Sequence, residues 1–213
     1  MKQPQDKGRR SALKRVGAIG AAAALPMTTG TATGAQAPRA ALQSLTAAEA
    51  TVLEAMVARI IPADASGPGA LEAGAATYID RALAGVLSGA RKAYAAGLAA
   101  VDAHAQSTRG APFAKLAPAD QDALLAAMEK NAAPGFTPNA SSFFNLVRNH
   151  TIQGTFCDPV YGGNANFIGW DMIGYPGLRM AVGPDDQRLD VKPQPTRMSA
   201  YSDPMFTKDH SHG

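Results

Sequence analysis

The sequence predicts an all-α protein. Apolar residues recur at helical spacing in several segments, and the clearest series runs from Val52 to Ile61. Two helix starts carry local signals, at Thr46 and at Pro118, whereas the alternating patterns of β-strands are scarce. We therefore expect an irregular bundle of about five helices, followed by a loop rich in glycine and aromatic residues and by an extended tail.

The first two helices are predicted on either side of a Gly/Pro linker. Thr46 and Glu49 have the spacing of a capping box, and Pro62 ends the apolar series that follows. After the linker at residues 66–69, a second helical pattern covers residues 71–87, and Gly89 is expected to interrupt or end it.

Three more helices are expected further along the chain. Tyr94, Leu98 and Val101 share one helical face in an alanine-rich segment, and Pro118 with Asp120 begins the fourth helix. The fifth is expected to start at Ser141 or Ser142 and to end near residues 158–159, where a proline follows.

The first 35 residues have the features of a twin-arginine export signal. A basic pair precedes an apolar run at residues 16–25, and small residues near 33–35 offer a processing site. The run is about half of the roughly 20 residues that a transmembrane helix needs, so it addresses the chain and does not anchor it. The export signal comprises Arg9, Arg10, Leu13 and Lys14.

Removal of this signal changes the charge of the protein. Residues 1–35 hold six of the 20 Lys and Arg and one of the 17 Asp and Glu, which leaves 14 basic against 16 acidic residues. The remaining chain is close to neutral and has no basic stripe interleaved with aromatics, which excludes nucleic acid as a partner. We expect one helical domain at residues 36–182 and an extended C-terminal arm at residues 183–213.

Cys157 is the single cysteine, so no internal disulfide, CxxCH haem site or paired-CxxC zinc site can form. In an exported protein such a thiol is either buried or paired with another chain. His150 lies seven residues earlier, about 10 Å along a helix, too far for a catalytic dyad. We predict no catalytic residue in this chain.

Cofactor and metal sites are also not expected here. The glycines at 67, 69 and 74 do not have GxGxxG spacing, which argues against a dinucleotide site. His104 has the position of a polar-face residue, whereas His210 and His212 lie in the polar tail, as do Asp185 and Asp186, without residues to orient them. The sequence therefore predicts no cofactor and no metal bound to this chain.

Ten of the thirteen aromatic residues lie between Phe136 and Phe206. Large aromatic side chains dominate both core packing and interfaces, so two interpretations stay open for Phe143, Phe144 and Trp170. Tyr161 and Tyr175 have Gly or Pro neighbours in an ordered loop, and we expect them to be exposed. The tail has too little apolar content to pack alone, and we expect a neighbour to order it.

Four segments in this part of the chain, residues 143–151, 154–164, 169–170 and 173–177, resemble the gluconate 2-dehydrogenase subunit 3 family. The resemblance implies no catalytic residues. It implies a motif loop, residues 156–177, that either contacts a partner or defines the fold. The motif residues are Phe156, Cys157, Asp158, Pro159, Tyr161, Gly162, Gly163, Asn164, Trp170 and Tyr175.

The resemblance also implies a function. Members of this family are small subunits of periplasmic, membrane-associated sugar or sugar-acid dehydrogenases. The expected large partner is a flavoprotein of the glucose-methanol-choline type that holds FAD, and a multihaem cytochrome c can complete the complex. The small subunit would supply the export signal and assist maturation of the flavoprotein. Cys157 is a candidate for an intermolecular disulfide with that partner.

A second interpretation from another class of protein is a self-sufficient exported protein that binds a sugar. Trp170, Tyr161 and Asn164 are residue types that contact sugars. The single helical pattern, without two lobes or convergent polar residues, argues against it.

Overall fold

The computed structural model describes residues 41–207, and within this range the protein is helical. Six α-helices have six or more residues, a four-residue helix follows near the end, and these residues form no β-strand. The all-α prediction is confirmed. The predicted export signal and His210 and His212 lie outside the described residues. The helices are α1 (Ala47–Ile60), α2 (Ala75–Ala84), α3 (Arg91–Arg109), α4 (Pro118–Glu129), α5 (Ala140–Phe156), α6 (Ile168–Ile173) and α7 (Pro204–Thr207).

The helix starts follow the local chemistry of the sequence in two cases. Thr46 and Glu49 form both hydrogen bonds of the capping box at the start of α1. Pro118 lies in the first turn of α4, where its missing N–H has no helical acceptor. Both starts were predicted from these residues alone.

The second helix is shorter than the pattern of apolar residues predicts. α2 begins after Gly74, which has a left-handed φ of 78°, and it ends at Ala84 before Gly85. The amides of Gly85 and Leu87 both donate to the carbonyl of Ala82 and so close the last turn. The prediction of residues 71–87 was therefore wrong at both ends, and Val86 lies outside the helix.

The start of α5 also differs from the prediction. Asn139 is the N-cap, and its side chain accepts a hydrogen bond from the amide of Ser142. The helix thus begins at Ala140, ahead of the serines that the sequence suggested.

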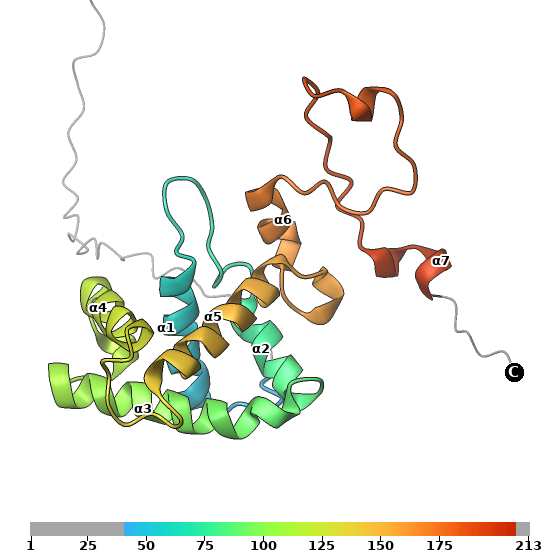
Figure 1. The fold of residues 1–213 in the computed structure, drawn as a ribbon. Coiled ribbons are helices and arrows are strands. Elements are labelled where there is room, and N and C mark those ends of the chain that lie inside the picture. The colour runs from blue at the N-terminus through green and yellow to red at the C-terminus, as the bar shows by residue number, and fades with distance from the viewer. Residues whose placement is uncertain (1–40, 208–213) are drawn as a thin grey trace, which may run out of the picture. The chain divides into compact units, whose positions relative to one another are not determined.

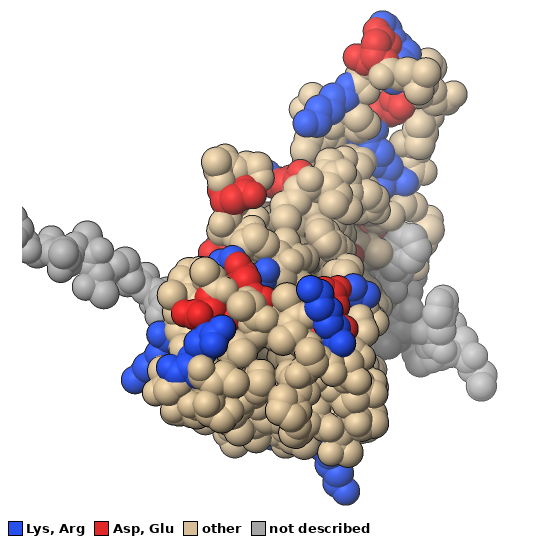
Figure 2. All heavy atoms as spheres, turned by 60° about the vertical axis from the view of Figure 1, so that its left-hand side comes forward, with Lys and Arg blue, Asp and Glu red and all other residues tan. Residues whose placement is uncertain are grey.

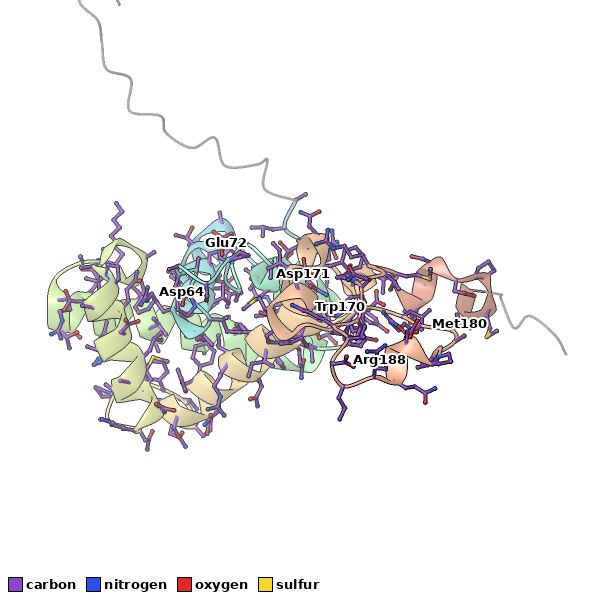
Figure 3. All side chains as sticks on the ribbon, turned by 90° about the horizontal axis from the view of Figure 1, so that it is seen from above. Asp64, Glu72, Trp170, Asp171, Met180 and Arg188 are labelled. Atoms are coloured by element: carbon purple, nitrogen blue, oxygen red, sulfur yellow. The ribbon has the colours of Figure 1, made fainter. Side chains whose placement is uncertain are left out.

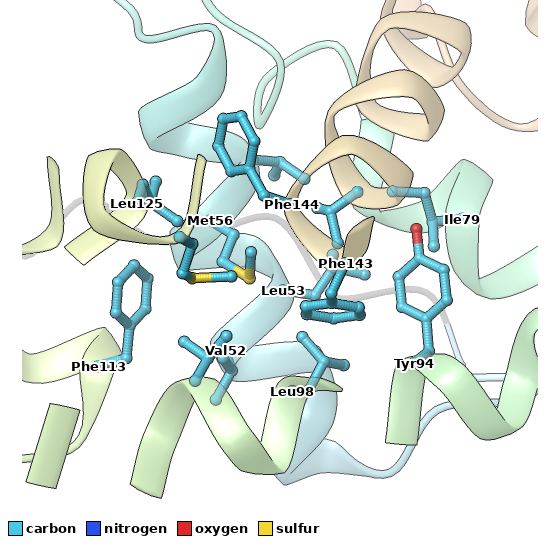
Figure 4. Close-up of a cluster of buried hydrophobic side chains, with 14 of the residues drawn as sticks. Val52, Leu53, Met56, Ile79, Tyr94, Leu98, Phe113, Leu125, Phe143 and Phe144 are labelled. Atoms are coloured by element: carbon cyan, nitrogen blue, oxygen red, sulfur yellow. The ribbon is translucent and has the colours of Figure 1, made fainter. Parts of the chain in front are cut away.

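The helix α5 organises the packing, since it contacts α1, α2, α3, α4 and α6 (Figure 1). The core between these helices is apolar, and Figure 4 shows its side chains converging from α1, α3 and α5. Gly97 permits close approach of α3 to α5, because a Cβ there would lie 2.2 Å from the ring of Phe143. The core includes Val52, Leu53, Met56, Ile79, Tyr94, Leu98, Phe113, Leu125, Phe143 and Phe144.

Asp80 fixes the start of the described chain to α2. Its carboxylate is buried and accepts hydrogen bonds from the amides of Gln43, Ser44 and Leu45. Three donors compensate for the loss of water around a buried charge.

Candidate functional site

The motif loop crosses the C-terminal half of α5 at backbone contact. A Cβ added to Gly163 would lie 2.0 Å from the carbonyl oxygen of Gly154, and one added to Gly169 would lie 1.8 Å from that of Thr155. Where α5 meets α2, a Cβ on Gly154 would lie 2.9 Å from the Cα of Ala75. These glycines are needed because backbone meets backbone at all three places.

Asn164 holds the loop in this position. The residue is fully buried, and its φ of 44° is left-handed, a conformation that asparagine tolerates. Its Nδ2 donates to the carbonyl of Cys157 at 2.8 Å, and its Oδ1 accepts from the amides of Gly169 at 2.8 Å and Trp170 at 3.3 Å. One side chain thus joins the end of α5 to the start of α6.

Trp170 is also part of the internal packing. It is 7% exposed, and its Nε1 donates to the carbonyl of Phe156 at 3.0 Å. Its ring meets that of Tyr175 edge-on, with centroids 4.9 Å apart. Phe143 and Phe144 are buried as well, so of the two interpretations of these three residues the core interpretation describes their positions.

Asp158 connects the motif loop with the C-terminal segment. Its carboxylate accepts from the Ser199 hydroxyl at 2.6 Å and from the Ala200 amide at 3.1 Å. The hydroxyl of Tyr161 lies 3.0 Å from that of Tyr201, and the two rings meet edge-on. Residues 199–201 of the predicted arm are therefore attached to the motif loop.

The intervening residues form a closed loop, which we call the C-terminal loop (residues 178–198). The Leu178 amide donates to the Met198 carbonyl, and the Thr196 amide donates to the Pro176 carbonyl. Met180 and Arg188 both belong to this loop, and Figure 3 shows them well separated from Asp64 and from Glu72. Its apolar side chains are largely exposed, and Leu189 is fully exposed, with a relative accessible surface of 106%.

A groove lies between α2 and α5, and three motif residues, Phe156, Cys157 and Tyr161, line it. It has a volume of about 640 Å³. We call it the α2–α5 groove and define it by Tyr78, Arg81, Ala82, Gly85, Val86, Ile152, Gln153, Phe156, Cys157 and Tyr161. A second, smaller cavity of about 390 Å³ shares Phe156 and includes Trp170, Ile173 and Tyr175.

The ten motif residues thus have different positions, and Asp158 joins the loop to the C-terminal segment. Gly163, Asn164 and Trp170 are buried and hold the fold. Phe156, Cys157 and Tyr161 line the groove, and Tyr161 and Tyr175 are exposed as expected. Pro159 starts a short 3-10 turn, and Gly162 ends it with a left-handed φ of 90°.

The α2 side of the groove was not predicted from the sequence. Tyr78, Arg81, Ala82 and Gly85 have i, i+3, i+4, i+7 spacing, which places them on one helical face. That spacing is the only signal, and it equally describes a core face.

Cys157 and His150 have separate surroundings. Burial raises the pKa of the Cys157 thiol, which keeps it protonated near neutral pH, and its sulfur lies 3.7 Å from the Gly154 carbonyl oxygen. The Nδ1 of His150 lies 2.9 Å from the Tyr94 hydroxyl, and burial lowers the pKa of this histidine. Neither arrangement activates a nucleophile.

Other kinds of site are not visible in residues 41–207. No three His, Cys, Asp or Glu side chains in this range are grouped to hold a metal ion. None of its helices has the length and hydrophobicity to span a bilayer. On the face shown in Figure 2, acidic and basic side chains are interspersed and form no stripe of one sign.

The positions of Asn164 and Trp170 argue against the sugar-binding interpretation. The buried Asn164 uses both side-chain polar atoms on the backbone, and Trp170 is buried, so two of the three candidate sugar contacts face the interior. Only Tyr161 of that set is exposed.

Comparison with known proteins gave one result. The family model of gluconate 2-dehydrogenase subunit 3 matches residues 47–177, more than half of the chain. Neither the search of curated proteins nor the search of solved structures found a match to this chain. The matched range covers α1 to α6 and the whole motif loop. It ends before the C-terminal loop. The chain therefore belongs to the gluconate 2-dehydrogenase subunit 3 family and is by that membership an accessory subunit of a dehydrogenase complex.

Proposed function

We propose that this chain is the non-catalytic small subunit of a periplasmic, membrane-associated dehydrogenase that oxidises sugars or sugar acids. In this proposal FAD is held by a large partner of the glucose-methanol-choline type, and a multihaem cytochrome c can complete the complex as a third subunit. The small subunit supplies the twin-arginine signal, carries the folded flavoprotein through export, and assists its maturation and stability. Family membership supports the dehydrogenase partner.

The observation that carries the accessory role is the exposed apolar surface around the motif loop. Ile152 is 44% exposed, Tyr161 52% and Ile173 61%, whereas the apolar residues of the core are buried. Exposed apolar residues gathered around a cavity are typical of protein interaction sites. We expect a stable interface above about 2,000 Å² in total.

Deletion of this chain tests the proposal, with the partner and its flavin located afterwards. We expect the flavoprotein to be missing from the periplasm or to reach it without FAD. A variant with Arg9→Lys and Arg10→Lys separates the two roles, since it should abolish export of both chains while leaving their association intact. Partner that reaches the periplasm loaded and active without this chain would refute the escort role.

The disulfide between Cys157 and the partner stays a prediction. Cys157 lines the α2–α5 groove and is half-buried in the free subunit, so a partner that fills the groove would come close to it. Non-reducing electrophoresis of the purified complex tests the link, with Cys157→Ser as the control. A small subunit that migrates free of its partner there would exclude the bond.

A further inference from the structure

The α2–α5 groove has apolar walls that the protein leaves uncovered. Ala82 of α2 and Gly85 at its C-terminal end line the groove together with Ile152 and Phe156 of α5. At its edge, Val86 is 90% exposed, because Gly85 ends the helix just before it. An exposed aliphatic side chain beside an apolar groove would be covered by a bound partner.

Most polar groups of the groove are already engaged. The Tyr78 hydroxyl donates to Oε1 of Gln153 at 3.3 Å, and the Tyr161 hydroxyl pairs with that of Tyr201. Small-molecule sites usually combine apolar walls with several convergent polar groups. The polar side chains of this groove are few, chiefly Arg81 and the amide of Gln153, and so it suits an apolar protein side chain better.

Arg81 is a cation without an ion-pair partner among residues 41–207. Six other arginines in this range pair with a carboxylate, which shows that such pairing is the usual state here. No carboxylate lines the groove with Arg81. The charge is therefore available to an acidic group from outside.

The motif loop orients this arginine. A Cβ on Gly162 would lie 2.5 Å from Nη1 and 2.7 Å from Cδ of Arg81. The absence of a side chain at Gly162, whose φ of 90° also favours glycine, lets the guanidinium lie against the loop at the groove. This contact gives one motif glycine a role in placing a surface charge.

We infer that the α2–α5 groove docks a segment of the dehydrogenase partner that inserts a large apolar side chain and pairs a neighbouring carboxylate with Arg81. The inference rests on the proposed function and specifies its interface. Tyr, Phe and Arg are among the residue types enriched at interfaces, and arginine binds carboxylates in a bidentate manner.

The test compares variants in the co-expressed complex. Arg81→Glu and Val86→Asp should each weaken co-purification of the flavoprotein by at least about tenfold, because one repels the carboxylate and the other buries a charge in the apolar contact. Arg81→Lys should retain part of the binding. The matched controls are Lys92→Glu, a charge reversal at an exposed site on α3, and Ala84→Asp, an exposed site on α2 outside the groove.

A photo-crosslinking amino acid at position 86 then identifies the occupant. We expect a link to a flavoprotein peptide that contains an acidic residue next to a large apolar one. Reversal of that acidic residue to Arg should restore binding of the Arg81→Glu variant. Circular dichroism and thermal unfolding of each variant separate a lost contact from a lost fold, and Val86→Asp decides the matter if Arg81→Glu unfolds.

The two proposals fail in different ways. If the wild-type chain co-purifies no flavoprotein, the proposed function is wrong. If it does so, and folded Arg81→Glu and Val86→Asp bind within twofold of wild type, the groove inference is overturned while the proposed function stands. A crosslink at position 86 to a lipid or another small molecule would also overturn it.

Discussion

The helices α1 to α5 and the motif loop are held together by different interactions. Between the helices most of the buried side chains are apolar, and those of Tyr94, Phe113 and Phe143 lie inside. In the motif loop the buried groups are largely polar or glycine, with Asn164 at the centre. The loop thereby reaches a fixed shape while leaving Tyr161 and Tyr175 at the surface.

The difference shows how a small subunit can hold an exposed aromatic surface in a defined geometry. A loop that buried all of its own aromatics would have none left for a partner. Hydrogen bonds from one buried amide and close backbone contacts at glycines, together with the buried ring of Trp170, fix the loop and leave Tyr161 exposed. The comparison predicts distinct responses to mutation in the two regions.

The largest effect is expected in the helical core. Leu53→Ala should lower the free energy of unfolding by about 4 kcal/mol, because Leu53 is fully buried and its truncation leaves a cavity. Leu53→Met, which conserves volume, should cost less than about 1.5 kcal/mol. Urea unfolding of the purified protein measures both, and a loss below about 1 kcal/mol for Leu53→Ala would contradict the dependence of the helical core on apolar packing.

The motif loop should respond most to loss of a polar group. Asn164→Ala should cost about 3 kcal/mol, since it leaves the Cys157 carbonyl and the Gly169 amide unpaired inside the protein. Asn166 is the matched control, because it is exposed and has a left-handed φ of 53°. Asn166→Ala should cost only about 1 kcal/mol. Equal losses at both positions would mean that backbone conformation, and not hydrogen bonding, holds the loop.

Acidification should act on the core through His150. Because burial lowers its pKa, the unfolded chain takes up a proton below about pH 6.5 before the folded protein does. The free energy of unfolding should therefore be constant from pH 8 to 7 and then fall toward pH 5, by less than about 1.4 kcal/mol per pH unit. His150→Phe should flatten this fall. An unchanged slope in that variant would assign the effect to other groups.

The smallest effect on stability is expected in the C-terminal loop. Leu189→Asp should change the free energy of unfolding by less than about 0.5 kcal/mol, because this side chain is fully exposed. If a neighbouring subunit orders the C-terminal loop, as expected for the tail, the same variant should still weaken the complex in a co-purification assay. A marked loss of thermal stability would show that the loop supports the fold.

Local signals in the sequence were sufficient for several helix boundaries. The capping box at Thr46 and the proline at 118 act within one turn, so they could be recognised without the tertiary structure. The ends of α2 could not, because Gly74 and Gly85 interrupt an apolar pattern that continues to Leu87. The start of α5 was misplaced because three neighbouring residues, Asn139, Ser141 and Ser142, can all act as caps.

The site was predicted in outline only. The family motif located the loop, and its glycines indicated an ordered shape. The role of Asn164 depends on where the chain places Cys157 and Gly169, and that path is a tertiary property. The α2 side of the groove was missed for the same reason, since Arg81 becomes notable only when Gly162 lies beside it.

Trp170 gives the motif loop its own spectroscopic signal. It is the single tryptophan of the sequence, it is buried, and its indole N–H is bonded to the Phe156 carbonyl. Intrinsic fluorescence excited at the red edge of protein absorption therefore arises from this loop, which includes α6, without interference from α1 to α5. A red shift of the emission would report opening of the loop even while circular dichroism records intact helices.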